Sequence, residues 1–200
     1  MHAEDRTGGA ASPIQPDAIE QAISSAVCQR MATVPLRSIK VAPLCRSCGV
    51  SRSAFYDRFV DVYDVAARLE EQLLRELDAL VEDTHRPGLG NYEICLTFLS
   101  FFARRRALVR ALLSNETAGR VRRELDVRLV SSLERALERR YDLEPTPPEE
   151  LGDILAFACA GFYHFYLDDG PSPDDATLER RARIAATFCD AGLRSLLGAR

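Results

Sequence analysis

The chain has 200 residues, of which 46% are hydrophobic, so it is long and apolar enough for one or two domains with buried cores. No apolar run approaches the roughly 18 residues of a transmembrane helix, and the N-terminus lacks the apolar segment of a signal peptide, so we expect a cytoplasmic protein. The net charge of −4 argues mildly against nucleic-acid binding, unless the basic residues gather on one local face.

The N-terminal tail, residues 1–15, is rich in Gly, Ala and Pro and is predicted to be disordered. A first helix is predicted over residues 16–30, with Asp17 and Glu20 in the spacing of a capping box. Its apolar stripe follows helical spacing and consists of Ile19, Ala22, Ile23, Ala26 and Val27. Residues 32–38 are predicted to form a loop.

Two short helices are predicted next, over residues 41–48 and 51–59. Pro43 falls in the first turn of the former, where a missing N–H group is tolerated. Gly49 interrupts the helical pattern between them, and Ser51 is a favourable N-cap for the second helix.

A longer helix is predicted from Asp61 to about residue 83, with Asp64 three residues after the capping position. Its buried side is marked by Val65, Leu69, Leu73, Leu77 and Leu80. The pair Pro87-Gly88 then forms the clearest boundary in the chain.

Helical periodicity continues without convincing strand alternation, so the predicted fold class is all-α, with about nine helices. Residues 91–113 are apolar on most faces at first and are predicted to form one central helix. Residues 118–141 carry a single apolar stripe. After a Pro-rich linker at 144–148, the last two helices are predicted over residues 147–168 and 174–197.

Basic residues concentrate between positions 30 and 60, where Asp57 is the only acid. They are Arg30, Arg37, Lys40, Arg46, Arg52 and Arg58. A basic face on an otherwise acidic protein is typical of local DNA binding, although a solvated basic surface gives the same composition.

The segment LCRSCGVSRSAFYDRF, residues 44–59, meets the requirements of a helix-turn-helix unit. The residues expected to pack its two helices together are Leu44, Cys45, Cys48, Val50, Phe55 and Phe59. Gly49 supplies the turn, where a positive φ is expected. The residues expected to project outward from the second helix, which enters the major groove in such units, are Arg52, Ser53, Ala54, Tyr56 and Arg58.

The run GVSRSAFYDRFVDVYDV resembles the signature of the TetR/AcrR family of transcription regulators, in which Gly-Val-Ser opens the recognition helix and aromatic-Tyr-x-x-Phe closes it. The resemblance covers about residues 17–68. It implies a helix-turn-helix DNA-binding domain over residues 16–62 and a helical effector-binding and dimerisation domain over residues 63–200. It also implies a sequence-specific, ligand-responsive repressor that binds a near-palindromic operator as a dimer.

The resemblance also suggests roles for single residues. Tyr56 and Ser51 match residues that bind phosphate, and Lys40 stands where a contact to the DNA backbone is usual. Arg52, followed by Ser53 and Ala54, falls where family members reach base edges, and arginine suits guanine best. The predicted DNA contacts are therefore Arg37, Lys40, Ser51, Arg52, Ser53, Ala54, Tyr56 and Arg58.

Two positions depart from the family pattern. Val62 stands where the family often has a lysine close to phosphate, and Arg58 where it more often has histidine. Loss of that lysine is expected to flatten the salt dependence of DNA binding by about one unit of slope, for which Arg58 can compensate.

In TetR-like proteins the helix after the connecting helix also lines the effector pocket. The candidate ligand contacts are Phe98, Phe101, Phe102, Phe162 and His164. The alternative is that these side chains belong to an ordinary core. The neighbouring run Arg104–Arg106 is expected to be a solvated face away from DNA.

Cys45-x-x-Cys48 allows a redox or metal hypothesis, but no second cysteine pair or histidine cluster completes a zinc site in the sequence. Small apolar residues are expected at these two positions, and cysteine packs as a small hydrophobe. The six cysteines are interpreted as reduced thiols. Paired carboxylates, a nucleophile motif and a phosphate loop are absent from the sequence, so we expect no catalytic residue, cofactor or metal, and a protein that is not an enzyme.

Small residues are frequent in the last two predicted helices: Ala156, Ala158, Ala160, Gly161, Ala182, Ala185, Ala186, Ala191 and Gly192. They allow close helix packing within one subunit or, as the resemblance implies, in a homodimer through residues 147–168 and 174–197. The expected partners are a double-stranded DNA operator, a second copy of the chain and an unidentified small-molecule effector, with no membrane. The alternatives are an activator, a regulator without an effector, or an adaptor of the same fold that has lost DNA binding.

Overall fold

The computed structural model describes residues 18–84, 86, 88–141, 149–167 and 172–197. Within these ranges the structure is all-helical, and no strand occurs among the described residues. The helices are α1 (Ala18–Met31), α2 (Val41–Cys48), α3 (Arg52–Tyr56), α4 (Val62–Thr84), α5 (Asn91–Arg104), α6 (Arg106–Leu113), α7 (Ala118–Tyr141), α8 (Glu149–Leu167) and α9 (Asp175–Leu197). The predicted fold class is therefore confirmed. The expected tail over residues 1–15 and the linker at 144–148 lie outside the described ranges.

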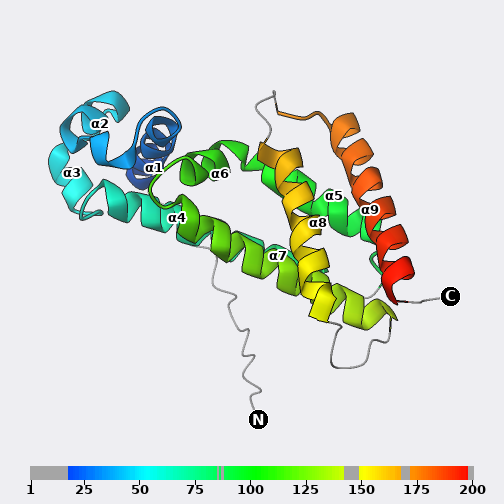
Figure 1. Cartoon of the computed structure of the whole chain (residues 1–200). Helices are drawn as coiled ribbons and strands as arrows, with labels where there is room; N and C mark the ends of the chain where they lie inside the picture. Colours follow the sequence, from blue (N-terminus) through cyan, green and yellow to red (C-terminus); the bar gives the residue numbers. More distant parts are fainter. Residues whose placement is uncertain (1–17, 85, 87, 142–148, 168–171, 198–200) are drawn as a thin grey trace, which may run out of the picture.

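The first three helices form a head at one end of the molecule, and α4 runs from this head along the body beside α7 (Figure 1). The head has its own apolar centre, built from Ile23, Val27, Leu36, Leu44, Phe55 and Phe59. All six side chains are almost completely buried. The apolar stripe of the first predicted helix thus faces this centre, while Asp17 of the expected capping box lies outside the described residues.

One of the two helix boundaries near the end of the head differs from the prediction. Helix α3 ends at Tyr56 rather than at residue 59, because the chain turns so that Phe59 can enter the centre of the head. Helix α4 begins as expected, since the Asp64 amide donates to Asp61 Oδ1 at 2.9 Å and the Val60 amide donates to Asp64 Oδ2 at 3.0 Å. The Val60 amide lowers the pKa of Asp64 below its ordinary value, with a further contribution from Arg68.

The single central helix predicted over residues 91–113 is wrong, because the chain bends at Arg105 into α5 and α6. In one continuous helix Arg105 would share a face with Phe98, Phe102 and Val109, all of which are buried. The bend removes this conflict and lets the Arg105 guanidinium pair with Glu76 of α4. Helix α6 is thereby directed against α1 of the head.

Two ion pairs join α4 to α7 along the body. Arg120 Nη2 lies 2.6 Å from Glu70 Oε2, and Arg128 Nε lies 2.7 Å from Asp78 Oδ1. The Glu70 side chain is only 4% exposed, and burial raises the pKa of its carboxyl even though Arg120 opposes this shift. These two ion pairs therefore hold α4 and α7 together along the body.

At the far end of the body, α9 packs most extensively on α5. Ala182, Ala185 and Ala186 are buried, so the small residues of α9 allow close packing within one subunit. Ala156, Ala160 and Gly161 of α8 are instead exposed, and the side chain of Ala158 lies outside the described ones. None of the described helices is both long and apolar enough to cross a lipid bilayer.

Candidate DNA-binding and ligand-binding sites

The turn between α2 and α3 has the local geometry that the sequence predicts. Gly49 adopts a left-handed conformation with φ of 69°, and its amide bonds back to Cys45 O. Ser51 caps α3, because its hydroxyl oxygen accepts a hydrogen bond from the Ala54 amide at 3.0 Å. This turn and cap set the direction of the short helix α3 on the surface of the head.

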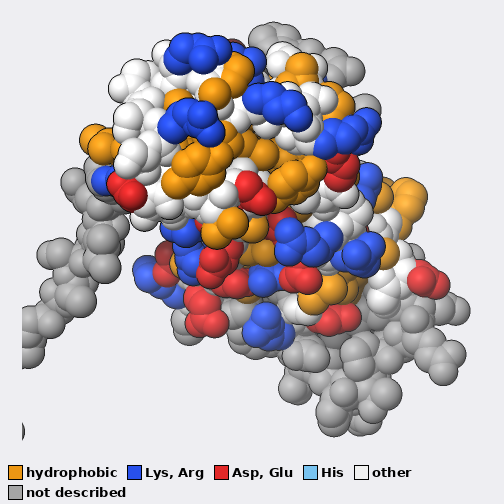
Figure 2. Space-filling view, turned by 90° about the vertical axis from the view of Figure 1, so that its left-hand side faces the viewer, with side chains coloured by type: hydrophobic (Ala, Val, Ile, Leu, Met, Phe, Trp, Pro, Cys, Tyr) orange, Lys and Arg blue, Asp and Glu red, His pale blue; other side chains and the backbone are white. Residues whose placement is uncertain are grey.

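Helix α3 presents several polar side chains to solvent. Arg52 and Ser53 are exposed, and Tyr56 is 51% exposed with its ring packed edge-on against the buried Phe55. Figure 2 looks onto the head and shows Lys and Arg side chains spread over the upper part of this face, with hydrophobic side chains between them. A basic surface with an exposed aromatic side chain suits the phosphate backbone and grooves of DNA.

Not every predicted DNA contact points freely outward. Ala54 and Arg58 are half-buried, and Arg58 Nη1 donates to Ala54 O at 3.1 Å, so this side chain folds back along its own helix. Arg37 is exposed but pairs with Glu116 at 2.9 Å. Lys40 is exposed at the N-cap of α2, and no carboxylate of the described residues lies within ion-pair distance of it.

Val62 does not stand at the surface. Its side chain is 6% exposed and packs in the core at the start of α4. Arg68, six residues later, stacks 4.8 Å from the centroid of the Phe59 ring and donates to Arg58 O at 2.8 Å. An arginine of α4 that the sequence analysis did not single out thus holds the residues that follow α3, Arg58 and Phe59, against α4.

Asn115 connects the head to the body and was also missed by the sequence analysis. Its side-chain oxygen accepts a hydrogen bond from the Leu36 amide at 2.7 Å. Its side-chain nitrogen donates to Met31 O at 2.7 Å and to Ala111 O at 2.8 Å. One side-chain amide therefore joins the end of α1, the turn before α2 and the end of α6. The sequence does not reveal these hydrogen bonds, because the partners of Asn115 are backbone atoms.

The cysteines of the helix-turn-helix behave as packing residues. Cys45 is buried, and burial raises the pKa of its thiol, which disfavours the reactive thiolate. The Cys48 Sγ donates to Leu44 O at 3.2 Å. Among the described side chains, no three of the types His, Cys, Asp and Glu are arranged so that they could hold a metal ion.

The candidate ligand contacts separate into two groups. Phe98, Phe101 and Phe102 are all buried in the core, and Phe101 also borders a groove of about 610 Å³ between α4 and α5. The side chains of Phe162 and His164 lie outside the described ones. The groove is completed by Leu80 of α4, by Leu96, Thr97, Ser100 and Arg104 of α5, and by Arg105.

The expectation that Arg104–Arg106 form a solvated face is wrong for two of the three residues. Arg104 is exposed, but Arg105 is half-buried between Glu76 and the ring of Phe101, whose centroid lies 4.6 Å from its guanidinium carbon. Arg106 is almost completely buried. The bend between α5 and α6 accounts for this difference, because it turns the three side chains toward different surroundings.

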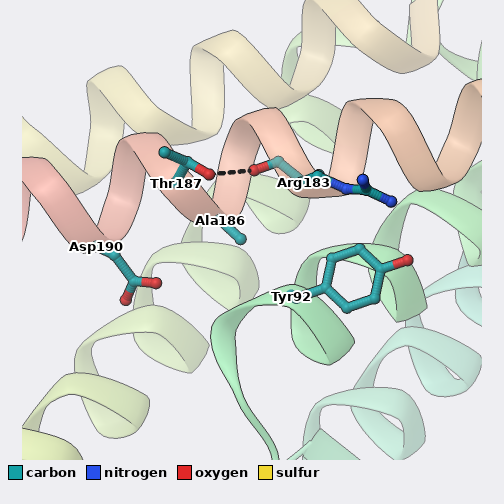
Figure 3. Close-up of a pocket in the computed structure, with 5 residues that line it drawn as sticks. All are labelled: Tyr92, Arg183, Ala186, Thr187 and Asp190. Atoms are coloured by element: carbon teal, nitrogen blue, oxygen red, sulfur yellow. Dashed lines mark hydrogen bonds between the residues drawn. The ribbon is translucent and has the colours of Figure 1, made fainter.

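A second hollow, of about 340 Å³, lies where the start of α5 meets α9. Figure 3 shows Tyr92 of α5 below α9, with its hydroxyl and the Arg183 guanidinium at one end and Asp190 at the other. The Thr187 hydroxyl donates to Arg183 O at 2.8 Å, so it is satisfied within α9. This hollow therefore offers one cation and one anion.

Comparison with known proteins identifies the fold. A TetR/AcrR-family transcriptional regulator from Aquifex aeolicus VF5 matches with a TM-score of 0.67 and 13% identity, over 86% of this chain and 99% of that one. A TetR-family regulator from Syntrophomonas wolfei matches with a TM-score of 0.62 and 15% identity, over 88% and 95%. The chain has the TetR/AcrR fold.

A transcriptional regulator from Pseudomonas aeruginosa PAO1 also matches, with a TM-score of 0.63 and 17% identity, over 91% of this chain and 93% of that one. No protein-family model matches the chain, and no curated protein matches it in sequence. The predicted resemblance is therefore confirmed at the level of the fold, across nearly the full length of these structures.

On this TetR/AcrR fold, α8 and α9 carry an apolar surface. Phe157 is 69% exposed, Phe188 is 59% exposed, and their ring centroids lie 6.4 Å apart. Ile184 is also exposed beside them. Together with Gly161 they line an apolar hollow of about 210 Å³.

Proposed function

We propose that the protein is a double-stranded DNA-binding transcription regulator, in which residues 16–62 bind the operator and residues 63–200 dimerise and bind an effector. The observation that carries the proposal is the capped helix α3, whose Arg52, Ser53 and Tyr56 side chains are exposed on a basic head. A helix presented in this way fits the major groove, and its arginine suits guanine.

The other predicted contacts take supporting roles in this proposal. Lys40 binds a phosphate from the start of α2, and Ser51 presents the first turn of α3 to the DNA backbone. Arg37 and Arg58 must leave Glu116 and Ala54 O, respectively, before they reach DNA. We therefore expect Arg52, Tyr56 and Lys40 to contribute most of the affinity.

A single short recognition helix contacts few base pairs, so useful specificity needs two heads. The exposed aromatic surface of α8 and α9 supports a homodimer, because a contiguous apolar patch of this kind is typical of an interface between chains. A two-fold dimer then implies a near-palindromic operator. Repression follows where that operator overlaps a promoter, and release follows where an effector lowers operator affinity.

The test begins with selection of binding sites from a random DNA pool, followed by titration of the selected duplex at physiological salt. Arg52→Ala is expected to weaken binding by about 1–3 kcal/mol and to relax base preference at one position of each half-site. Lys40→Ala is expected to weaken all sequences alike and to reduce the salt slope by about one unit.

Arg75→Ala is the matched control, because Arg75 is an exposed arginine of α4 that pairs only with Glu71 one turn away in the described structure. It is expected to leave DNA affinity unchanged. If Arg52→Ala and Tyr56→Ala bind DNA as tightly as the parent chain, the proposal is wrong and an adaptor of the same fold replaces it.

A further inference from the structure

The groove between α4 and α5 combines an apolar wall with two guanidinium groups. Its volume of about 610 Å³ falls within the range of small-molecule sites, which is roughly 300–1,000 Å³. The half-buried Leu80 and Leu96 supply apolar surface from α4 and α5, and the almost completely buried Phe101 adds a small exposed part. A ligand that fits this wall therefore needs an apolar body.

The charge of the groove is positive on the α5 side. Arg104 is exposed, its Nε donates to Ser100 O at 3.3 Å, and no carboxylate of the described residues lies within 4.0 Å of its guanidinium nitrogens. Asp175 lines the adjoining hollow with Arg104 but does not reach this distance. Arg105 also lines the groove, with Glu76 as its carboxylate partner.

The hollow between α5 and α9 gives a useful contrast (Figure 3). There, Arg183 is balanced by Asp190 within the same lining, and Asn91 Nδ2 donates to Asp190 Oδ1 at 2.5 Å. A net positive lining together with apolar walls thus distinguishes the groove between α4 and α5 from this second hollow.

We propose that the groove binds an organic monocarboxylate with an apolar chain or ring. Its carboxylate lies between Arg104 and Arg105, since a guanidinium binds a carboxylate through two parallel hydrogen bonds. Its apolar part lies against Leu80, Leu96 and Phe101. This binding does not depend on the proposed function, whereas the regulatory consequence rests on it.

That consequence follows from the position of Glu76. The Glu76–Arg105 pair joins α4, which leads from the head, to the bend between α5 and α6. A ligand carboxylate replaces Glu76 as the partner of Arg105 and so loosens α4 at this point. Ligand and operator then oppose each other, and by linkage each lowers the affinity of the other by the same factor.

The test is calorimetric titration of the full chain with octanoate and with 4-phenylbutyrate, using octanamide as the uncharged counterpart of octanoate. Both carboxylates are expected to bind at about 1 mM or tighter, and octanamide about tenfold more weakly or worse. Arg104→Gln and Arg105→Gln are each expected to weaken carboxylate binding about tenfold. Glu76→Gln is expected to strengthen it several-fold, because the competing carboxylate is gone.

Arg183→Gln is the matched control, since it removes a cation from the other hollow and is expected to leave carboxylate affinity unchanged. Circular dichroism on heating establishes that each variant is folded. The proposal is overturned if neither carboxylate binds by about 1 mM, if octanamide binds as tightly as octanoate, or if Arg183→Gln rather than Arg104→Gln reduces affinity.

A separate arm adds octanoate to the complex of the chain with its selected DNA duplex. Release of DNA by octanoate in the parent chain, and its absence in Arg104→Gln, supports the regulatory consequence. Carboxylate binding by a chain that binds no DNA supports the site and overturns the proposed function. DNA binding by a chain that binds no carboxylate supports the proposed function and overturns the carboxylate site.

Discussion

Gly49 illustrates how one residue sets the direction of α3, the proposed recognition helix. Its φ of 69° lies in the left-handed region, which other L-residues adopt at a cost of about 1–2 kcal/mol. A Cβ added at this glycine would meet no heavy atom within 4 Å, so any cost of substitution comes from the backbone and not from a clash.

We therefore expect Gly49→Ala to lower the free energy of unfolding by about 1–2 kcal/mol, and Gly49→Asn to lower it by less, since asparagine tolerates this conformation. Urea denaturation measures both values. Gly119→Ala in α7 is the control, because Gly119 has no positive φ and an added Cβ would come no closer than 3.7 Å to another side chain, that of Arg123. Equal stability of Gly49→Ala and the parent chain would contradict the account.

Some residues of the candidate DNA-binding and ligand-binding sites can be predicted from the sequence, and others cannot. Gly49 and Ser51 are predictable, because left-handed turns and N-caps depend on local residue types. The environments of Arg105 and Arg106 are not, since the bend that separates them results from packing against α4 and α1 and not from a local helix breaker. Phe98 and Phe102 likewise proved to be core residues, which composition cannot distinguish from a pocket lining.

The turn between α6 and α7 connects the head to the body through Asn115. Asn115 uses its acceptor on Leu36 and its donors on Met31 O and Ala111 O, so a shift of α6 changes the hydrogen bonds of the head directly. The sequence predicted most of these helices from their apolar stripes, but contacts between helices far apart in the chain carry no periodic signal.

Asn115→Ala is expected to destabilise the fold by about 1–3 kcal/mol, because it leaves polar backbone groups without a partner. Hydrogen exchange of the Leu36 amide is expected to accelerate in this variant. Asn115→Asp keeps an acceptor for Leu36 and is expected to preserve its protection, while the two donated bonds are lost. Ser114→Ala, whose hydroxyl bonds only within α6, serves as the control and should leave the Leu36 amide protected.

For the whole molecule, we expect the apolar surface on α8 and α9 to form the interface of the proposed dimer. Phe157→Glu places a charge in the centre of this surface and is expected to weaken dimerisation at least about tenfold, with a parallel loss of operator affinity. Sedimentation equilibrium measures the effect. Val34→Glu is the control, since Val34 is an exposed apolar residue that follows α1 in the head, at the other end of the molecule from α8 and α9 (Figure 1).

A parent chain that remains monomeric at micromolar concentration would contradict the dimer, and a Phe157→Glu variant that dimerises normally would place the interface elsewhere. The family resemblance pointed to the last two helices as the interface, but their small residues did not separate packing within one subunit from packing between two. Ala182, Ala185 and Ala186 serve packing inside the subunit, and the exposed surface comes mainly from Phe157, Phe188 and Ile184.

The burial of those alanines has a mechanical consequence. Helix α9 is held against α5 on one side and, in the proposed dimer, against a second chain on the other. The α5 wall of the groove is therefore backed by α9, whereas its α4 wall is linked to the bend between α5 and α6 by the Glu76–Arg105 pair. In the proposed regulation, a ligand that takes the place of Glu76 beside Arg105 would release this one link of α4, the helix that leads to the head, while α5 stays packed on α9.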